Sequence, residues 1–225
     1  MLDFGPFILS LKLSLITTVL LFIIGVPVAY WLAYSRSRAK VLIEALVALP
    51  IVLPPSVLGF YLLLAFSPQN AFGSWLDKYM DIRLVFTFPG LVVASLLYSL
   101  PFMVQPIQSG FQQLPRSLME AAYTLGKGKM TTLLRVLLPN VRMAVITGCI
   151  LSFAHTIGEF GVVLMVGGNI PGETRVVSIA IYDEVEAMNY GTAGVYSAIL
   201  LAFSFLVLAT VYLINFNQRS KTEAR

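Results

Sequence analysis

Residues 114–140 read LPRSLMEAAYTLGKGKMTTLLRVLLPN, the longest polar interruption in a strongly apolar sequence. Pro115 suits the first turn of a helix, and good helix formers follow it. Gly126 can adopt the left-handed conformation that commonly ends a helix. A second helical run, 131–138, then reaches Pro139, which stops or kinks it. The stretch predicts two short helices joined by a tight turn, either a docking knob for a cytosolic partner or a solvated basic loop.

The same stretch carries a resemblance to a known motif. Glu120-Ala121-Ala122, then Gly126 after three residues, then Leu138-Pro139 resembles the EAA loop of ABC-importer permease subunits. The resemblance implies that the loop inserts into a groove on an ATP-hydrolysing subunit and transmits nucleotide-driven closure to the membrane spans. It therefore implies ATPase-coupling roles for Glu120, Ala121, Ala122, Gly126, Leu138 and Pro139.

Composition places the protein in a membrane. Of its 225 residues 58% are hydrophobic and only 12% are charged, with a mean hydropathy of +0.84. A soluble domain carries about 25% charged residues. We therefore predict an all-α polytopic membrane protein, one transmembrane domain over residues 1–225. The N-terminus has no basic region or cleavage pattern, so we expect no removed signal peptide.

Hydrophobic runs predict five, or at most six, transmembrane helices. The spans are expected at about 7–34, 41–66, 87–111, 141–166 and 191–216, with the loop 114–140 between spans and an outer loop or short helix at 167–190. Eleven of the fifteen Lys and Arg residues follow the first span, follow the third span or lie in the tail: Arg36, Arg38, Lys40, Arg116, Lys127, Lys129, Arg135, Arg142, Arg219, Lys221 and Arg225. The positive-inside rule then puts the N-terminus outside and the C-terminus and loop 114–140 in the cytoplasm.

Proline and small residues mark candidate pathway positions. Pro54 and Pro55 fall inside the second span, where freed carbonyls need a neighbouring helix or a polar pathway. Ordinary kinked helices also contain such prolines. In the fourth span, small residues recur at every fourth position, which permits close helix packing. This stripe, Ala144, Gly148, Ser152 and Thr156, forms a partner interface, a pathway wall or a packing seam within the subunit.

His155 and Glu159 are the ionisable residues well inside the fourth span, and intramembrane ionisable groups are functional candidates. Glu159 lies ~27 Å along a helix from Val141, near the outer end. We favour a local hydrogen-bonding role for Glu159 over contact with a ligand, and a packing role for His155. A His/Glu pair without further ligands makes a poor metal site. The candidate pathway or gate residues are thus Pro54, Pro55, Ser152, Thr156 and Glu159.

Three glutamines end the third span on one helical face. Gln105, Gln108 and Gln112 follow i, i+3, i+7 spacing and lead into the loop 114–140. They line an inner vestibule or, as we favour, contact headgroups or the loop.

Two further stretches extend the resemblance. GEFGVVLMVGGNIPGETRVVSIAIYDEVE (158–186) resembles sulfate and molybdate permeases, and its NIPGETR part leans toward molybdate or tungstate. LPIVLPPSVLGFYLL (49–63) resembles the second span of molybdate permeases. The resemblance implies a type I ABC-importer permease fold in the cell inner membrane. Its implied partners are a second permease copy, two ATPase subunits and an external oxyanion-binding protein.

The absence of nucleotide-binding and active-site motifs narrows the range of functions expected for this sequence. The chain has no Gly-x-x-x-x-Gly-Lys-Ser/Thr phosphate loop and no enzyme active-site motif. We therefore expect no enzyme, no nucleic-acid partner and no cofactor in this chain, with ATP and Mg²⁺ on a partner ATPase. A sulfate or thiosulfate permease remains an alternative. A stand-alone secondary anion transporter is disfavoured because it would show inverted repeats or charged residues at the membrane midplane.

Overall fold

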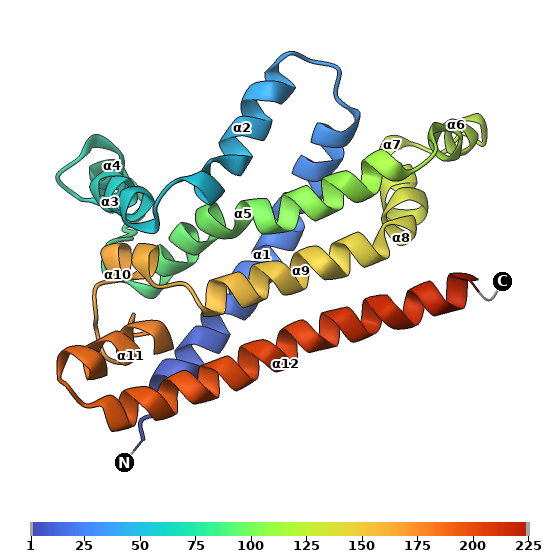
Figure 1. Cartoon of the computed structure of the whole chain (residues 1–225). Helices are drawn as coiled ribbons and strands as arrows, with labels where there is room; N and C mark the ends of the chain where they lie inside the picture. The colour runs from blue at the N-terminus through green and yellow to red at the C-terminus, as the bar shows by residue number, and fades with distance from the viewer. Residues whose placement is uncertain (1, 224–225) are drawn as a thin grey trace.

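The computed structural model describes residues 2–223, which form helices and no strand (Figure 1). Three helices are long and apolar enough to cross a membrane: α1 (Gly5–Tyr34), α5 (Phe88–Gln113) and, over Tyr190–Thr210, α12 (Tyr190–Glu223). The number rises to five if each of two bent helix pairs counts as one span. The all-α membrane architecture predicted from composition is therefore confirmed.

Shorter helices complete the chain, some packed along these three and some at the ends of the bundle. They are α2 (Ala39–Val52), α3 (Pro55–Phe66), α4 (Ala71–Met80), α6 (Arg116–Thr124), α7 (Lys129–Thr132), the π-helical turn η1 (Leu133–Leu137), α8 (Leu138–Asn140), α9 (Arg142–Ile157), α10 (Gly161–Gly167) and α11 (Val177–Glu186). α1 packs along α5 and α9, α2 packs on α5, and α12 packs on α9. In Figure 1, α6 and the C-terminus lie at one end of the molecule, and the N-terminus lies with α11 at the other.

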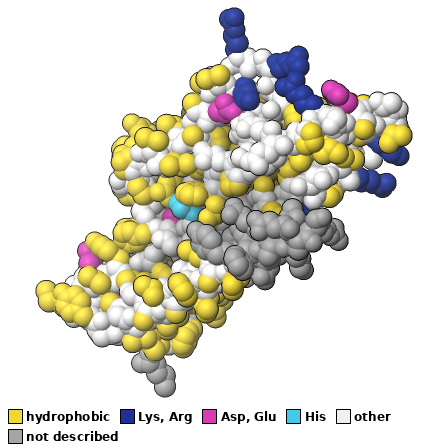
Figure 2. Space-filling model, turned by 45° about the vertical axis from the view of Figure 1, so that its right-hand side comes forward, with side chains coloured by type: hydrophobic (Ala, Val, Ile, Leu, Met, Phe, Trp, Pro, Cys, Tyr) yellow, Lys and Arg dark blue, Asp and Glu magenta, His cyan; other side chains and the backbone are white. Residues whose placement is uncertain are grey.

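The basic side chains gather toward one end of the molecule. Figure 2 shows Lys and Arg side chains gathered toward one end of the visible face, with a broad apolar surface over the rest. A wide apolar surface is expected where lipid or another subunit covers a helical bundle. The basic tail predicted at 217–225 continues α12 as far as Glu223, and Arg225 lies outside the described residues.

The predicted second span, 41–66, is two helices rather than one. α2 ends at Val52, α3 begins at Pro55, and their axes differ by 114°. Pro54 follows Leu53, whose ψ of 135° is extended. A residue before proline is driven out of the helical region by the proline ring, which explains the position of the bend.

The predicted fourth span, 141–166, is also interrupted. α9 ends at Ile157 and α10 begins at Gly161, so the segment 158–160 breaks the helix.

Pro139 was expected to stop or kink the preceding helix, but the helical turns continue through it. The chain bends by 80° between Lys129–Asn140 and α9. The π-helical turn η1 directly precedes this proline, so the hydrogen-bond pattern already departs from that of a regular α-helix where the Pro139 N–H is missing.

The bundle core lies where α1, α5 and α9 cross. Met103, Ile107 and Phe111 of α5 are fully buried there. Gly148 of α9 lies so close to α5 that a Cβ on it would be 3.1 Å from the Met103 carbonyl oxygen. Of the three alternatives for the small-residue stripe of α9, packing within the subunit is the one observed. Glycine allows this close approach in a membrane, where packing drives helix association.

Candidate functional site

α6 begins the loop 114–140 and exposes an apolar tip beside its acidic residue. Glu120 and Ala121 are exposed, whereas Ala122 is buried on the side that faces η1. Leu125, at the end of the helix, is 75% exposed. A large apolar side chain held out on a helix next to a charge is suited to insertion into a groove on another protein.

The end of α6 is defined by Gly126. Its φ of +71° is left-handed, as its position in the sequence predicts. The Gly126 N–H donates to the Tyr123 carbonyl oxygen at 2.9 Å, and the Lys127 N–H donates to the Ala122 carbonyl oxygen at 3.0 Å. This pair of bonds is a Schellman motif, which satisfies the last carbonyls of the helix. The apolar tip is therefore held in one orientation.

The second half of the loop joins α6 to the bundle core. Leu137 of η1 is 1% exposed and packs in the same cluster as Phe111 of α5. The Tyr34 hydroxyl of α1 donates to the Phe111 carbonyl oxygen at 3.0 Å. Leu138 is half-buried and Pro139 is exposed in α8, directly before α9. The loop thus connects α6 to the start of α9 by way of the bundle core.

The structure therefore divides the six predicted coupling residues into two groups. Glu120, Ala121, Ala122 and Gly126 share α6 and its end, whereas Leu138 and Pro139 lie in the separate turn before α9.

The breaks in the two interrupted helices lie against each other. Pro54 and Pro55 form the exposed corner between α2 and α3. A Cβ on Gly161, the first residue of α10, would lie 2.7 Å from the Pro55 Cβ. A Cβ on Gly59 of α3 would lie 2.8 Å from the Met165 Cβ. α3 and α10 are thus closely packed, which brings the breaks of the two discontinuous helices together.

The other predicted pathway residues are buried between α5 and α9. Ser152 is fully buried, and Thr156 and Glu159 are only 3% and 5% exposed. The Thr156 and Ser99 hydroxyls are 3.0 Å apart. Ser95 donates to Glu159 Oε2 at 3.0 Å, while Glu159 Oε1 is buried without a hydrogen-bond partner among the described residues. In this conformation, none of these three residues faces an open passage.

The turn after α9 is also tied to α11. The Ser178 hydroxyl donates to the backbone carbonyl oxygen of Glu159 at 2.5 Å. Glu159 therefore joins the break in its own helix to α5 through its side chain and to α11 through its backbone, in agreement with the local hydrogen-bonding role favoured from the sequence.

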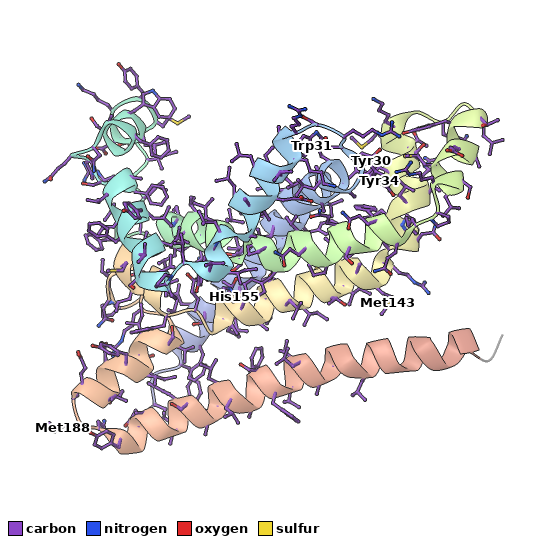
Figure 3. The ribbon with its side chains drawn as sticks, turned by 45° about the horizontal axis from the view of Figure 1, so that its top comes forward. Tyr30, Trp31, Tyr34, Met143, His155 and Met188 are labelled. Atoms are coloured by element: carbon purple, nitrogen blue, oxygen red, sulfur yellow. The ribbon has the colours of Figure 1, made fainter. Side chains whose placement is uncertain are left out.

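Figure 3 labels His155 on α9, and its ring packs against two aromatic rings of α5. Its ring stacks on Phe102 with centroids 4.0 Å apart and lies 4.8 Å from the Tyr98 centroid. Its Nδ1 is 2.9 Å from the Ser99 hydroxyl. This is the packed, hydrogen-bonded histidine favoured from the sequence. Sequence reasoning missed Ser95 and Ser99, although their i, i+4 spacing places them on one face of α5.

A second polar contact that sequence reasoning missed joins α2 to α5. Gln108 Nε2 donates to Glu44 Oε1 at 2.5 Å, and Lys40 Nζ lies 3.7 Å from the same oxygen. Gln105 and Gln112 are exposed on α5 beside this contact. The signal was a single carboxylate within the apolar run 41–66.

In the 167–190 loop, one ion pair and several hydrogen bonds hold the charged side chains. Arg175 forms a 3.0 Å ion pair with Asp183, which also accepts a 2.6 Å hydrogen bond from Asn169. The Tyr182 hydroxyl donates to Glu186, and that bond raises the pKa of the phenol. Within residues 2–223, no group of three His, Cys, Asp or Glu side chains could hold a metal ion.

Comparison with known proteins gives the family. Residues 25–221 match the family described as "Binding-protein-dependent transport system inner membrane component". The chain is 51% identical over 211 residues, 93% of either chain, to the molybdenum transport system permease protein ModB of Azotobacter vinelandii. It is 34% identical over 189 residues to the sulfate transport system permease protein CysT of Escherichia coli (strain K12), covering 84% of this chain and 68% of CysT.

A solved structure shares the fold. A chain from the inward-facing MetNI methionine ABC transporter superposes with a TM-score of 0.70 at 15% identity, covering 92% of this chain and 91% of that one. The likeness confirms the type I importer permease fold. The protein therefore belongs to the family of binding-protein-dependent transport system inner membrane components, the permease subunits of ABC importers.

Proposed function

We propose that this permease subunit carries molybdate or tungstate across the inner membrane in an ATP-driven importer. The observation that supports it most is the 51% identity, over 93% of both chains, to a molybdenum permease. The sulfate permease relative is more distant, at 34% identity. Sulfate or thiosulfate is therefore the second candidate cargo, and direct comparison of the oxyanions tests the choice.

ATP hydrolysis belongs to a partner chain in this proposal. Lys127 is followed by Gly and Lys129 by Met, so neither continues a phosphate-binding loop. Two ATPase subunits, which bind ATP and Mg²⁺, dock on the α6 helices of two permease copies. A binding protein delivers the oxyanion at the outer end, and the C-terminus and α6 face the cytoplasm. The exposed small residues Gly194, Ala198 and Ala202 of α12 suit close packing with the second copy.

The transport cycle is an alternation between two packed states. Closure of the ATPase dimer brings the two α6 helices together. Because Leu137 anchors the loop in the α1–α5–α9 core, the movement reaches α9 and then its break at 158–160. That break lies against the corner between α2 and α3, so both discontinuities move together and open the pathway outward. Hydrolysis and product release reset the inward-facing state.

Purification followed by reconstitution tests this function. A tagged chain isolated in mild detergent should carry a stoichiometric ATPase subunit with a phosphate-binding loop. In proteoliposomes with internal ATP, a molybdate-loaded binding protein should stimulate uptake and hydrolysis more than a sulfate-loaded one. A chain that purifies alone, and that moves an anion down its gradient without ATP, would refute the proposal.

A charge-reversal variant tests the coupling residue. Glu120→Lys should abolish transport-linked hydrolysis, because Glu120 lies on the exposed face of α6. Glu173→Lys, which reverses a charge in the outer loop, is the matched control and should keep it. Intact coupling in Glu120→Lys would show that α6 docks by other residues.

A further inference from the structure

The contact between Lys40, Glu44 and Gln108 lies at the basic end of the bundle. Glu44 is the sixth residue of α2, so it sits ~8 Å along the helix from Ala39, in the inner part of the membrane. Ala39 itself follows the turn that carries Arg36 and Arg38. The side chains of Lys40 and Glu44 are 24% and 36% exposed in the single subunit.

Lipid is a poor neighbour for this group. Glu44, Gln108 and the exposed Gln105 and Gln112 form a polar strip along α2 and α5. Ionisable and amide side chains within membrane helices face protein or a water-filled cavity, because hydrocarbon leaves them unsatisfied. Since part of the strip is exposed in the subunit, we place it against the passage or the second copy, in place of the headgroup or loop contact favoured for the glutamines from the sequence. This placement rests on the proposed transport function.

We infer that Lys40 and Gln108 form a transient oxyanion site at the inner mouth of the pathway, and that Glu44 occupies it as an internal substitute anion. An ammonium and an amide N–H are the donors that a tetrahedral oxyanion uses in proteins. Here one Glu44 oxygen faces both donors: it accepts a hydrogen bond from Gln108 at 2.5 Å and forms an ion pair with Lys40 Nζ at 3.7 Å.

The substitution of one anion for another sets the affinity of the site. An oxyanion that reaches the inner mouth must displace Glu44 from Gln108, and Glu44 then repels the dianion and returns to its place when the cargo leaves. A unit charge ~6 Å from a dianion in a water-like medium weakens binding by about tenfold. Glu44 thereby keeps the inner site weak, which favours release into the cytoplasm and opposes re-entry.

Neutralising Glu44 without changing its shape separates this role from a structural one. Glu44→Gln keeps an oxygen that can accept from Gln108, so a simple strut between α2 and α5 would survive. The matched control is Glu173→Gln, which removes the same charge from an exposed outer residue that accepts one hydrogen bond, from the Phe88 N–H at 3.3 Å. Lys40→Gln, placed in the Glu44→Gln background, removes the cation of the site.

The readout is equilibrium binding of radiolabelled molybdate to the nucleotide-free permease–ATPase complex in nanodiscs, where any binding by the ATPase is common to all variants. Glu44→Gln should bind about tenfold more tightly than wild type, Glu173→Gln should match wild type, and adding Lys40→Gln should reverse most of the gain. In proteoliposomes, Glu44→Gln should also be inhibited by about tenfold lower internal molybdate.

The proposal of an inner site and the proposed transport function can be refuted separately. Normal ATP-driven molybdate uptake by wild type, together with a Glu44→Gln affinity within twofold of wild type, would overturn the inner site and leave the proposed function standing. An equal gain in Glu173→Gln would also overturn it, because the effect would then be one of net charge. Absence of ATP-driven uptake by wild type would overturn both.

Discussion

Replacement of Gly126 by alanine tests whether the backbone turn after α6 is needed for docking. Gly126 has a φ of +71°, and nothing lies within 4 Å of the position that a Cβ would occupy, so alanine would meet backbone strain but no steric clash. An L-residue in the left-handed region costs ~1–2 kcal/mol. Gly128 is also free of neighbours, but its φ is −70°. Gly128→Ala is therefore a control two residues away that adds the same methyl group without the strain.

The assay measures the affinity of the purified permease for its ATPase, with one of the two partners immobilised on a surface. If docking requires the observed turn, ~1–2 kcal/mol weakens binding by about 5–30-fold in Gly126→Ala. Gly126→Asn should lose less, because asparagine tolerates the left-handed region better. Binding-protein-stimulated ATP hydrolysis should fall in the same order. Equal affinities for Gly126→Ala and Gly128→Ala would refute the reasoning, because strain at Gly126 is their sole designed difference.

Two further predictions concern stability. Ser95→Ala removes the hydrogen bond to the buried carboxylate of the α9–α10 break, which costs ~1–3 kcal/mol and lowers the apparent melting temperature by about 2–12 °C. Ser109→Ala, on the exposed side of α5, should change it by less than ~2 °C, and a similar loss in both would contradict this assignment. Gly90→Ala would place a Cβ 1.6 Å from the Leu84 carbonyl oxygen and should sharply reduce the yield of folded protein. Gly191→Ala, with open space around it, should express normally, and a normal yield of Gly90→Ala would show that the α5 start can shift freely.

The buried position of Ser152, Thr156 and Glu159 bears on how the pathway forms. These residues are enclosed between α5 and α9 in this conformation, whereas the Pro54–Pro55 corner is exposed. Thr156 and Glu159 tie α9 and the break at 158–160 to α5 and α11 through hydrogen bonds, whereas the Ser152 hydroxyl is buried without a partner among the described residues.

The sequence alone determined the features that depend on composition and local backbone preference. A mean hydropathy of +0.84 indicates a membrane protein whatever its tertiary contacts. The end of α6 at Gly126 follows from the conformational freedom of one residue. The EAA spacing and the resemblance of the 158–186 stretch indicated the importer family, because such motifs are continuous in the chain.

Contacts between distant residues were decided by the tertiary structure. Ser95 with Glu159, and Glu44 with Gln108, are each 64 positions apart. Periodicity shows which residues share a helix face, but it does not show which helix that face meets. For the same reason, a hydrophobic run could not show that 41–66 turns by 114° or that its corner packs on the break in the fourth predicted span. Helix packing, which depends on the whole chain, assigned each polar side chain its partner.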